Sequence, residues 1–395
     1  MEPSESHQPD VLVVGASARA AGWSACHAFK QIAACDRFGD SDLRECATTL
    51  VTPTLRRKEV AKRLQAQQWF EGLNSIAVLP AGGMENQPTL WKWLERSSDF
   101  WGTKWHHVRQ VRDPKSVVTG IQSLPIRCPE HRHAGDAPPR SGRWLLKSKN
   151  SGGGIQVSVW EPTQVISPRL ELWPTTDYLQ QYIEGIDHSA TFVASQGRVV
   201  LVGVTRQLTG LPELGAQGWW YCGSVGPVQL ESRQRRMLEK LGEQLVQKFQ
   251  LEGIFGVDLR WDGEAWWLLE VNPRYPAGAE VLERSSGLSV VELYAKARRG
   301  GELTWEPSLK RTVAKGIWFN QGATLGPALP KGIQASQAEG VPWDRSIADV
   351  PEVGTSIGPG FPVFSVFSSV SRFEDAVERL MTTARIWETL IFATI

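Results

Sequence analysis

The sequence is poor in the features that mark several large classes of protein. Its five cysteines are odd in number and contain no C-x-x-C pair, which argues against a disulfide framework and a zinc knuckle. No stretch approaches the roughly 20 apolar residues of a membrane-spanning helix, and residues 1–10 are polar, without the apolar core of a secretion signal. We therefore expect a soluble protein of the reducing cytoplasm with no membrane partner.

A strong charge of either sign is also missing. The 43 basic and 42 acidic residues leave a net charge of +1, so there is no electrostatic reason to expect a nucleic-acid partner. The apolar fraction of 41% is ordinary for a globular protein. A chain of 395 residues exceeds what one core usually supports, which predicts two or three domains. The oligomeric state stays open, and a homodimer is the commonest soluble assembly.

The N-terminal part follows a strand–turn–helix–strand pattern that is typical of a Rossmann-like domain with a parallel sheet. We expect strands at Val11–Val14, Ile32–Cys35 and Leu73–Pro80 and a helix over about residues 20–29. Gly15 and Asp36 suggest a dinucleotide site, but G-x-G-x-x-G is absent, because the next glycine after Gly15 is Gly22. A domain that only packs is the alternative.

The middle of the chain is dominated by strands, after a loop that we expect at residues 125–142 because it is rich in proline, glycine and charge. The expected elements are strands at Trp144–Lys147, Gln156–Trp160, Leu179–Ile183, Ala190–Ala194 and Val199–Val204, a helix at Gln234–Phe249, a strand at Val363–Phe367 and a helix from Phe373 to about Thr389.

The first chemical feature is a lysine followed closely by a run of glycines. Lys147 ends an apolar strand, and Gly152, Gly153 and Gly154 follow. Consecutive glycines allow backbone N–H groups to converge on an anion, to which the lysine adds a mobile positive charge. This is not a Walker A motif, since G-K-[ST] is missing. A flexible hairpin tip is the alternative.

The second feature runs from Gln180 to His188. A strand edge offers a free backbone donor and acceptor, which suit the amino group and ring nitrogen of adenine. Acidic side chains just beyond the strand could bond ribose hydroxyls. An ordinary turn after the strand is the alternative.

The third feature is a hairpin that carries acidic residues inside apolar strands. Such residues are costly unless they are paired or bound to a cation. Glu270 and Asn272 share a face by alternation. A two-residue turn would aim Asp258 away from them, whereas a three-residue loop, Asp262-Gly263-Glu264, would pair position 258 with 268 and place Asp258 on the same face. We favour the three-residue loop and a magnesium site; acids that are solvated or salt-bridged to Arg260 and Arg274 are the alternative.

Taken together, these motifs resemble the ATP-grasp superfamily over residues 10 to 300. The resemblance implies an α/β fold, α+β in the central part, with a Rossmann-like domain at 10–105 and an ATP-grasp domain at 106–300. That domain has two lobes, at about 106–180 and 181–300. Residues 301–395 resemble the β-rich C-terminal cap of biotin carboxylase, through Ala348-Asp349-Val350-Pro351, Gly354-Thr355, Ile357, Gly360 and Pro362. The branch resembled most is a carboligase group related to biotin carboxylase, near tyramine–glutamate ligases of one-carbon (methanofuran-type) cofactor synthesis.

The resemblance also implies a role for each matching residue, with ATP and Mg²⁺ (or Mn²⁺) as cofactors. Lys147 would contact the α- and β-phosphates, and Gly152–Gly154 would close over the γ-phosphate. Backbone groups of Gln181 and Ile183 would bind adenine, and Asp187 or Glu184 would hold the ribose. Asp258, Glu270 and Asn272 would hold one or two metal ions, and Arg274 would face the acyl phosphate.

The sequence departs from the family pattern at several positions. The second phosphate lysine usually follows an acidic residue directly, whereas Pro114 separates Lys115 from Asp113. Gln180 stands where many members have glutamate. Arg274 is followed by Tyr-Pro-Ala-Gly rather than by Gln-Val-Glu-His, which argues against carboxylation of biotin.

The implied reaction joins a small carboxylate to an amine through an acyl phosphate, with ADP and phosphate released. Bicarbonate activation of the biotin-carboxylase type and a non-catalytic ATP-binding module are the alternatives. Arg206, at the end of a strand, could bind a substrate carboxylate, and Trp219-Trp220, in a glycine-rich loop, could form a substrate lid. A structural arginine and an ordinary loop are the alternatives. Half of the 36 aromatic residues are tryptophan, yet only this pair lies in such a loop.

Overall fold

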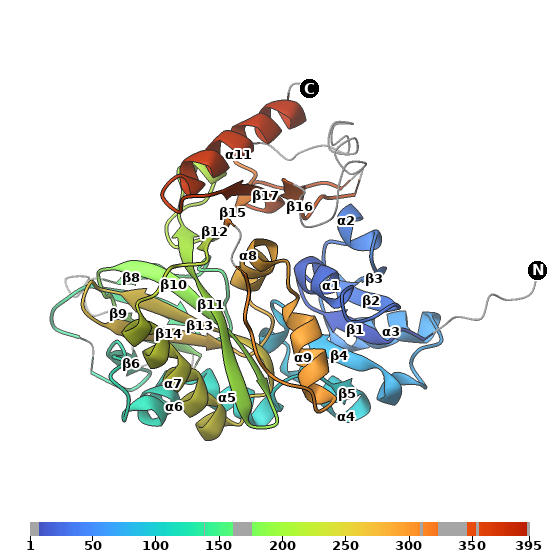
Figure 1. Cartoon of the computed structure of the whole chain (residues 1–395), viewed down its shortest axis with the longest axis horizontal. Coiled ribbons are helices and arrows are strands. Elements are labelled where there is room, and N and C mark those ends of the chain that lie inside the picture. The colour runs from blue at the N-terminus through green and yellow to red at the C-terminus, as the bar shows by residue number, and fades with distance from the viewer. Residues whose placement is uncertain are drawn as a thin grey trace, which may run out of the picture.

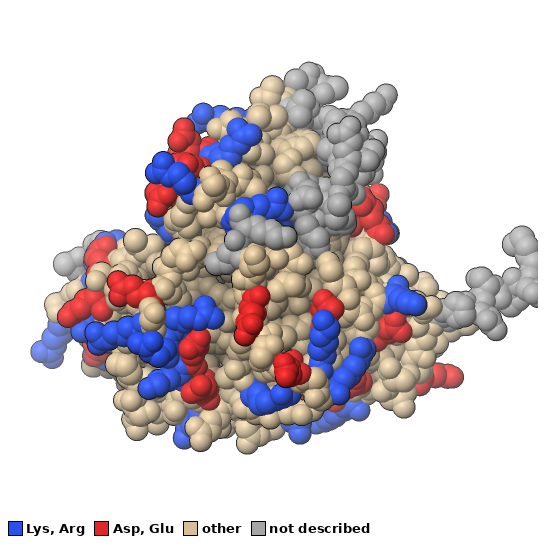
Figure 2. Space-filling view, in the orientation of Figure 1, with Lys and Arg blue, Asp and Glu red and all other residues tan. Residues whose placement is uncertain are grey.

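The computed structural model describes residues 8–137, 139–160, 176–308, 311–322, 346–352 and 355–392. They form three sheets with the mixed α/β class that the sequence predicts (Figure 1). On the face shown in Figure 2, basic and acidic side chains are intermingled, in keeping with the balanced charge. Within the described part of the chain, no helix has the length and apolarity needed to cross a bilayer.

The N-terminal sheet is parallel and has the strand order β3-β2-β1-β4-β5. Its strands are β1 (Val11–Val14), β2 (Ile32–Asp36), β3 (Thr48–Val51), β4 (Ala77–Pro80) and β5 (Asp99–Phe100). The helices of this region are α1 (Arg19–Ala25), α2 (Ser41–Arg44), α3 (Arg57–Ala66) and α4 (Pro88–Ser97). Helix α5 (Trp105–Val111) follows, and α6 (Pro114–Ile121) packs against helix α7 (Ser232–Phe249). The strand expected from Leu73 begins only at Ala77, because Leu73–Ser75 forms a 3₁₀ turn.

The same domain favours packing over a dinucleotide site at Gly15 and Asp36. The Asp36 carboxylate accepts hydrogen bonds from the backbone N–H groups of Ala18, Phe38 and Gly39. A Cβ on Gly15 would lie 2.8 Å from that of Ala81. The Asp36 carboxylate is therefore engaged by its own loop, and Gly15 serves a close contact with Ala81.

A four-stranded antiparallel sheet follows, with the order β6-β9-β7-β8. Its strands are β6 (His131–His133), β7 (Trp144–Ser148), β8 (Ser158–Trp160) and β9 (Asp177–Gln181). The expected loop at 125–142 thus contains a strand, and β9 lies two residues earlier than expected. Both differences arise because β6 pairs along β9, a long-range contact that the polar sequence of β6 does not reveal.

The third sheet has eight strands in the order β14-β13-β10-β11-β12-β15-β17-β16. They are β10 (Ile186–Ser195), β11 (Arg198–Thr209), β12 (Tyr221–Gly226), β13 (Gly253–Trp261), β14 (Trp266–Asn272), β15 (Thr312–Phe319), β16 (Ile347–Ala348) and β17 (Pro362–Val370). Pairing of β12 with β15 joins the expected cap to this sheet. Helix α11 (Ala376–Phe392) packs on β15 and β17. Gly354 of the cap signature lies outside the described residues.

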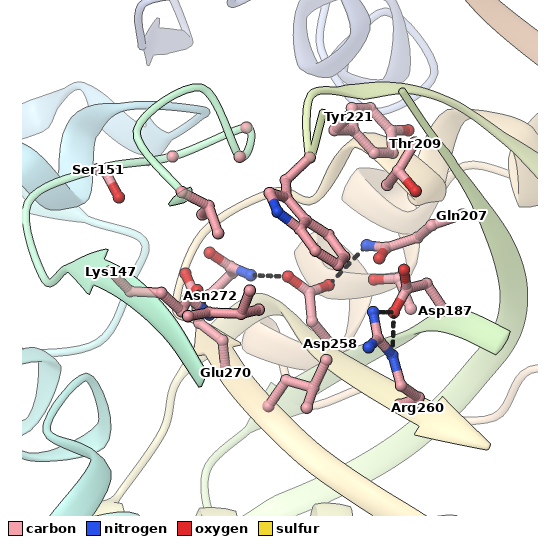
Figure 3. Close-up of a pocket in the computed structure, with 18 of the residues that line it drawn as sticks. Lys147, Ser151, Asp187, Gln207, Thr209, Tyr221, Asp258, Arg260, Glu270 and Asn272 are labelled. Atoms are coloured by element: carbon pink, nitrogen blue, oxygen red, sulfur yellow. Dashed lines mark hydrogen bonds and ion pairs between the residues drawn. The ribbon is translucent and has the colours of Figure 1, made fainter. Parts of the chain in front are cut away.

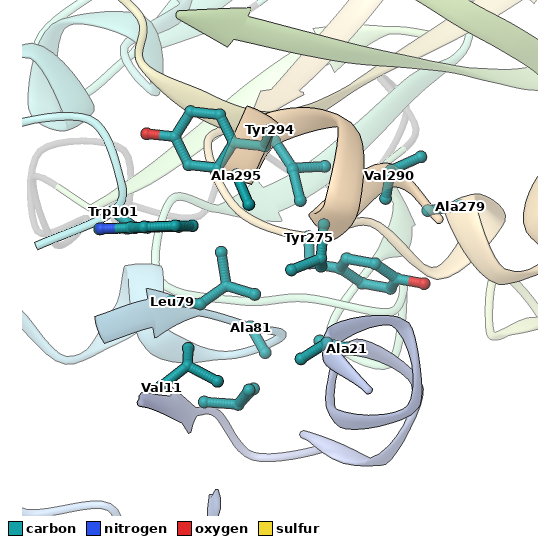
Figure 4. Packing of buried hydrophobic residues seen from close by; sticks show 14 of the residues in the cluster. Val11, Ala21, Leu79, Ala81, Trp101, Tyr275, Ala279, Val290, Tyr294 and Ala295 are labelled. Atoms are coloured by element: carbon teal, nitrogen blue, oxygen red, sulfur yellow. The ribbon is translucent and has the colours of Figure 1, made fainter. Parts of the chain in front are cut away.

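Apolar cores fix these parts against one another. Helix α7 (Ser232–Phe249) covers the large sheet through a core that includes Phe192 and Phe255. Helices α8 (Ala277–Ser286) and α9 (Val290–Arg298) lie between the large sheet and the N-terminal sheet. Figure 4 shows their core, in which the rings of Trp101 and Tyr294 meet edge to face at 5.4 Å. The end of β4 is therefore held firmly beside the start of α8.

Candidate active site

The hairpin of β13 and β14 brings the three expected metal ligands together. Asp258 pairs directly with Glu270, and Asn272 donates from Nδ2 to Asp258 Oδ2 over 2.9 Å. The expected register was wrong, however, since Trp261 pairs with Trp266 around a four-residue loop. A β-bulge at Leu269 then shifts the register so that Asp258 reaches the Glu270 face.

Two carboxylates facing each other favour a cation between them. Burial, followed by the charge of Glu270, raises the pKa of Asp258 to about 6. Gln207, on β11, donates to Asp258 Oδ1 over 2.9 Å. Among the described residues, no group of three or more His, Cys, Asp or Glu side chains is placed to hold a metal ion. A site here would therefore use two carboxylates, the Asn272 amide and ligands from water or phosphate, a set that suits Mg²⁺.

Lys147 projects from β7 toward this acidic face (Figure 3). Its Nζ lies 3.3 Å from Gln180 Oε1 and 3.7 Å from Glu270 Oε2. Burial alone would lower the pKa of Lys147, but Tyr178, Glu270 and Asp258 carry it above its ordinary value. The lysine is therefore charged at neutral pH, as an anion-binding group must be.

The two hydrogen-bond partners of the Gln180 amide determine its orientation. Lysine can only donate a hydrogen bond, and a backbone carbonyl can only accept one. Gln180 Oε1 accepts from Lys147, while Nε2 donates to the carbonyl of Leu269, the bulged residue, over 3.3 Å. Gln180 therefore ties the lysine to the bulge and acts as a support for Lys147.

Lys147, Asp258, Glu270 and Asn272 line one cavity. The glycine loop lies over this cavity and touches the tryptophan loop. Gly152, Gly153 and Gly154 all line the cavity. Gly153 accepts a hydrogen bond from the Tyr221 N–H over 2.9 Å. Gly154 has a φ of +74°, and a Cβ there would lie 1.8 Å from the carbonyl oxygen of Trp219. Only glycine fits this contact.

The two tryptophans of the expected lid point to different places. Trp219 lines the cavity, and its ring centroid lies 5.3 Å from that of Tyr182. Trp220 packs on Phe319 at 5.5 Å, against the C-terminal core. Only Trp219 is placed to meet a ligand.

The residues expected to bind the nucleoside are divided in the same way. Gln181, Ile183 and Asp187 line the cavity, but Glu184 is exposed and pairs with Arg143 at 3.1 Å. The Gln181 N–H already donates to the Glu130 carbonyl over 2.8 Å, so this N–H is not free for adenine as expected.

Asp187 pairs with Arg260, which the sequence suggested only as a salt-bridge partner of the hairpin acids. Arg260 donates from Nε to Asp187 Oδ1 over 2.7 Å and from Nη1 to the Ile183 carbonyl over 2.6 Å. Arg260 is buried and also lines the cavity. It thus fixes the segment from Ile183 to Asp187 that the resemblance assigns to the nucleoside.

Arg274 lines the cavity next to the metal ligands. Its Nη2 lies 3.3 Å from Asn272 Oδ1, and its Nε lies 3.1 Å from Glu85 Oε1. Two further cavity residues, Ala277 and Gly278, form the N-terminus of α8. An arginine beside a helix N-terminus is a setting for a developing anion.

Besides Glu184, two further expected site residues lie outside this cavity. Lys115 is exposed, and its nearest acidic partner is Asp136 at 4.0 Å. Arg206 is exposed on the opposite face of β11, because side chains alternate along a strand and its neighbour Gln207 faces inward. The strand continues to Thr209, so Arg206 lies within β11 rather than at its end, and it does not line the cavity.

Several site residues were not singled out from the sequence. Tyr178, Gln207 and Arg260 contact the expected residues from other strands of the same sheets. Glu85 does so from the N-terminal domain. Thr205 and Gln207 share one face of β11, because side chains alternate along a strand. This alternation was the one available signal for Gln207. The other three depend on long-range pairing.

Comparison with known proteins identifies the central region. Residues 114–278 match the family model of the ATP-grasp domain. A comparison with curated proteins gave no match.

Solved structures resemble the whole chain at low identity. An L-amino acid ligase from Bacillus licheniformis is 15% identical, with a TM-score of 0.67 over 97% of this chain and 98% of that one. A carboxyaminoimidazole ribonucleotide synthase from Aspergillus clavatus, complexed with ATP, is 13% identical, with a TM-score of 0.68 over 96% and 99%. The biotin carboxylase domain of a Hydrogenobacter thermophilus 2-oxoglutarate carboxylase, in complex with MgADP, ADP and bicarbonate, is 14% identical, with a TM-score of 0.70 over 95% and 90%. At such low identity, the structural likeness establishes the fold alone. Together with the family match, it shows that this chain contains an ATP-grasp domain.

Proposed function

We propose that the protein is an ATP-dependent carboxylate–amine ligase that forms an amide through an acyl phosphate. The observation that carries this proposal is the meeting of Lys147, the Asp258–Glu270–Asn272 set and Arg274 in one cavity under the glycine loop. Phosphoryl transfer to a carboxylate requires a cation near the phosphates and acidic residues that hold a metal ion. It also requires a positive group beside the acceptor carboxylate, which Arg274 would supply.

The proposed reaction has two steps. A carboxylate oxygen of the first substrate attacks the γ-phosphorus of ATP, the bond to ADP breaks, and an acyl phosphate forms. The amine nitrogen then attacks the acyl carbon, phosphate leaves, and the nitrogen loses a proton. No covalent protein nucleophile is needed, because positioning and charge neutralisation lower both barriers.

Each side chain has a place in this scheme. Lys147 would neutralise the α- and β-phosphates, and Asp258, Glu270 and Asn272 would hold one or two Mg²⁺ ions, which supply further neutralisation when bound. Arg274 and the first N–H groups of α8 would receive the carboxylate and the acyl phosphate. The glycine loop and Trp219 would exclude water, which would otherwise hydrolyse the acyl phosphate.

The substrates are proposed as a class: a small carboxylic acid and an amine. L-Glutamate with tyramine is the first pair to test, given the resemblance to tyramine–glutamate ligases, and the L-amino acids are next, given the fold shared with an L-amino acid ligase. ADP release is measured against a panel of amino acids, amines and bicarbonate, with mass spectrometry of the products. Release that needs an acid and an amine supports the proposal. Release with bicarbonate alone would replace it with carboxyphosphate formation, and no release with any probe would remove it.

A further inference from the structure

Glu85 comes from the N-terminal domain yet touches the reactive end of the ATP-grasp site. It lies in the loop after β4, is 3% exposed, and accepts from Arg274 Nε over 3.1 Å. The two residues are 189 positions apart. Burial would raise the pKa of Glu85, but Arg274 and Arg112 hold it below its usual range, so the carboxylate is ionised beside the arginine.

The loop that carries Glu85 is itself anchored from two sides. Arg112 donates from Nη1 to the Glu85 carbonyl over 3.1 Å and to Asn86 Oδ1 over 2.8 Å. Its Nη2 lies 3.5 Å from the carbonyl of Ser151, directly before the glycine loop. On the other side, the Tyr275 N–H donates to the Pro80 carbonyl over 3.3 Å. These contacts fix Glu85 relative to both the glycine loop and Arg274.

The contact decides how Arg274 is presented. Nε is occupied by Glu85, Nη1 donates to the Tyr275 carbonyl over 3.2 Å, and Nη2 donates to Asn272 Oδ1 over 3.3 Å. Each terminal nitrogen of a guanidinium carries two N–H groups, so one on each remains for an anion in the cavity. Without Glu85, the long side chain would lose the bond that fixes its rotation about Nε.

We infer that Glu85 is a positioning residue, which orients Arg274 for the acyl end of the reaction and makes the N-terminal domain part of the active site. This inference rests on the proposed function for its kinetic consequence but not for its structural one. A misplacement of about 1 Å in a reacting group can cost roughly 100-fold in rate. Only one of the two carboxylate oxygens of Glu85 bonds Arg274, so a glutamine at this position can separate the effect of the hydrogen bond from that of the negative charge.

Glu85 Oε2 is buried and has no hydrogen-bond partner within the described ranges. A Glu85→Gln variant therefore keeps an acceptor for Arg274 Nε and forfeits no bond at the second atom, but it removes the charge. A Glu85→Leu variant removes both. Asn86→Ala is the matched control, because it alters the same loop and the same Arg112 without touching Arg274.

The first test needs no substrate. Phenylglyoxal modifies accessible arginines, and peptide mapping by mass spectrometry reads Arg274 separately from the others. We expect Arg274 to be labelled at least about fivefold faster in Glu85→Leu than in the wild type, with Glu85→Gln between them and Asn86→Ala at the wild-type rate. Equal labelling in Glu85→Leu and the wild type, in proteins with intact circular dichroism, would overturn the inference.

The second test is a double-mutant cycle with Arg274→Leu, read as ADP release with L-glutamate and tyramine or with the amino-acid mixture. If Glu85 acts through Arg274, Glu85→Leu lowers kcat about 10- to 100-fold, leaves the KM for ATP within about threefold, and adds nothing to Arg274→Leu. Glu85→Gln should recover part of the loss. Additive losses would show an independent structural role and overturn the inference. Absence of ADP release in the wild type would instead remove the proposed function, while the labelling test still decides the role of Glu85.

Discussion

Asn272 donates its amide N–H to Asp258 Oδ2 over 2.9 Å, although the two residues lie on different strands and 14 positions apart. The contact exists because a bulge at Leu269 places Asp258 opposite Glu270 rather than opposite its neighbour. A hairpin without the bulge would turn Asp258 to the other face. The metal-binding hypothesis therefore depends on one extra residue in β14.

Replacement of Glu270 by glutamine should abolish ADP production. The variant keeps the shape of the side chain but removes one of the two carboxylates that face each other across the hairpin. We expect turnover to fall by at least about 1000-fold, because charge on the transferring phosphoryl group would lose its metal-centred compensation. Circular dichroism should be unchanged. Near-normal turnover at saturating Mg²⁺ would exclude Glu270 as a metal ligand.

Replacement of Lys147 by alanine should act on ATP, and Lys149 offers a control two residues away. Lys147 lines the cavity, whereas Lys149 donates to Asp113 over 2.7 Å outside it. We expect Lys147→Ala to lose ADP production and at least about tenfold in nucleotide affinity by isothermal titration. Lys149→Ala should keep nucleotide affinity and lose only some stability. Equal nucleotide affinities in the two variants would contradict the assignment of Lys147.

Stability should depend on pH through a buried carboxyl at the domain junction. Burial raises the pKa of Glu283 to about 7, against hydrogen bonds from Ser24, Tyr275 and Val290. A raised folded-state pKa means that the folded protein holds this proton more tightly than the unfolded chain. Its contribution is therefore complete below about pH 4.5 and is lost as pH rises through about 7.

The corresponding variant is Glu283→Gln, with Glu264→Gln on an exposed hairpin tip as its control. Between about pH 5 and pH 8 we expect the free energy of unfolding to fall more steeply in the wild type and the control than in Glu283→Gln. The difference should be on the order of 1 to 3 kcal/mol. Urea titrations at each pH measure it, and parallel curves for all three proteins would contradict the expectation.

The sequence predicted which residues meet in the cavity better than it predicted their geometry. Alternation and polar residues in apolar strands were enough to select Asp258, Glu270 and Asn272, and the glycine run was enough to select the loop. Arg206 was placed in the wrong position because the sequence pattern did not show which face of β11 turns inward, and a shift of one residue reverses every side chain. Glu85 could not be found, since Arg274 is brought near it only by packing between domains. Arg260 was not assigned to Asp187, because that contact depends on the register of β13 with β10, two strands that are far apart in the sequence.

The tryptophan loop gives a prediction in which two neighbours should behave differently. Trp219 lines the cavity, while Trp220 packs on Phe319. We expect Trp219→Ala to raise the KM for ATP about tenfold with little loss of stability. Trp220→Ala should lower the free energy of unfolding by about 2 kcal/mol, through the lost packing. Thermal unfolding and steady-state kinetics on both variants separate the roles, and a stability loss confined to Trp219→Ala would reverse them.

Closure of the glycine loop should depend on Gly154 in particular, rather than on the number of glycines in the loop. A methyl group at Gly154 would lie 1.8 Å from the carbonyl of Trp219, at a φ of +74°. Gly197 has a similar φ of +78°, but a Cβ there meets nothing within 4 Å. Gly197→Ala therefore carries the backbone cost alone, about 1 kcal/mol. Gly154→Ala carries the same cost and also forces the loop away from Tyr221.

We expect turnover to fall more than tenfold in Gly154→Ala and less than twofold in Gly197→Ala, because an open loop admits water to the acyl phosphate. ADP release without amide product, measured side by side, would reveal that hydrolysis, and tightly coupled turnover in Gly154→Ala would show that the contact with Trp219 is not the closed state that the reaction uses.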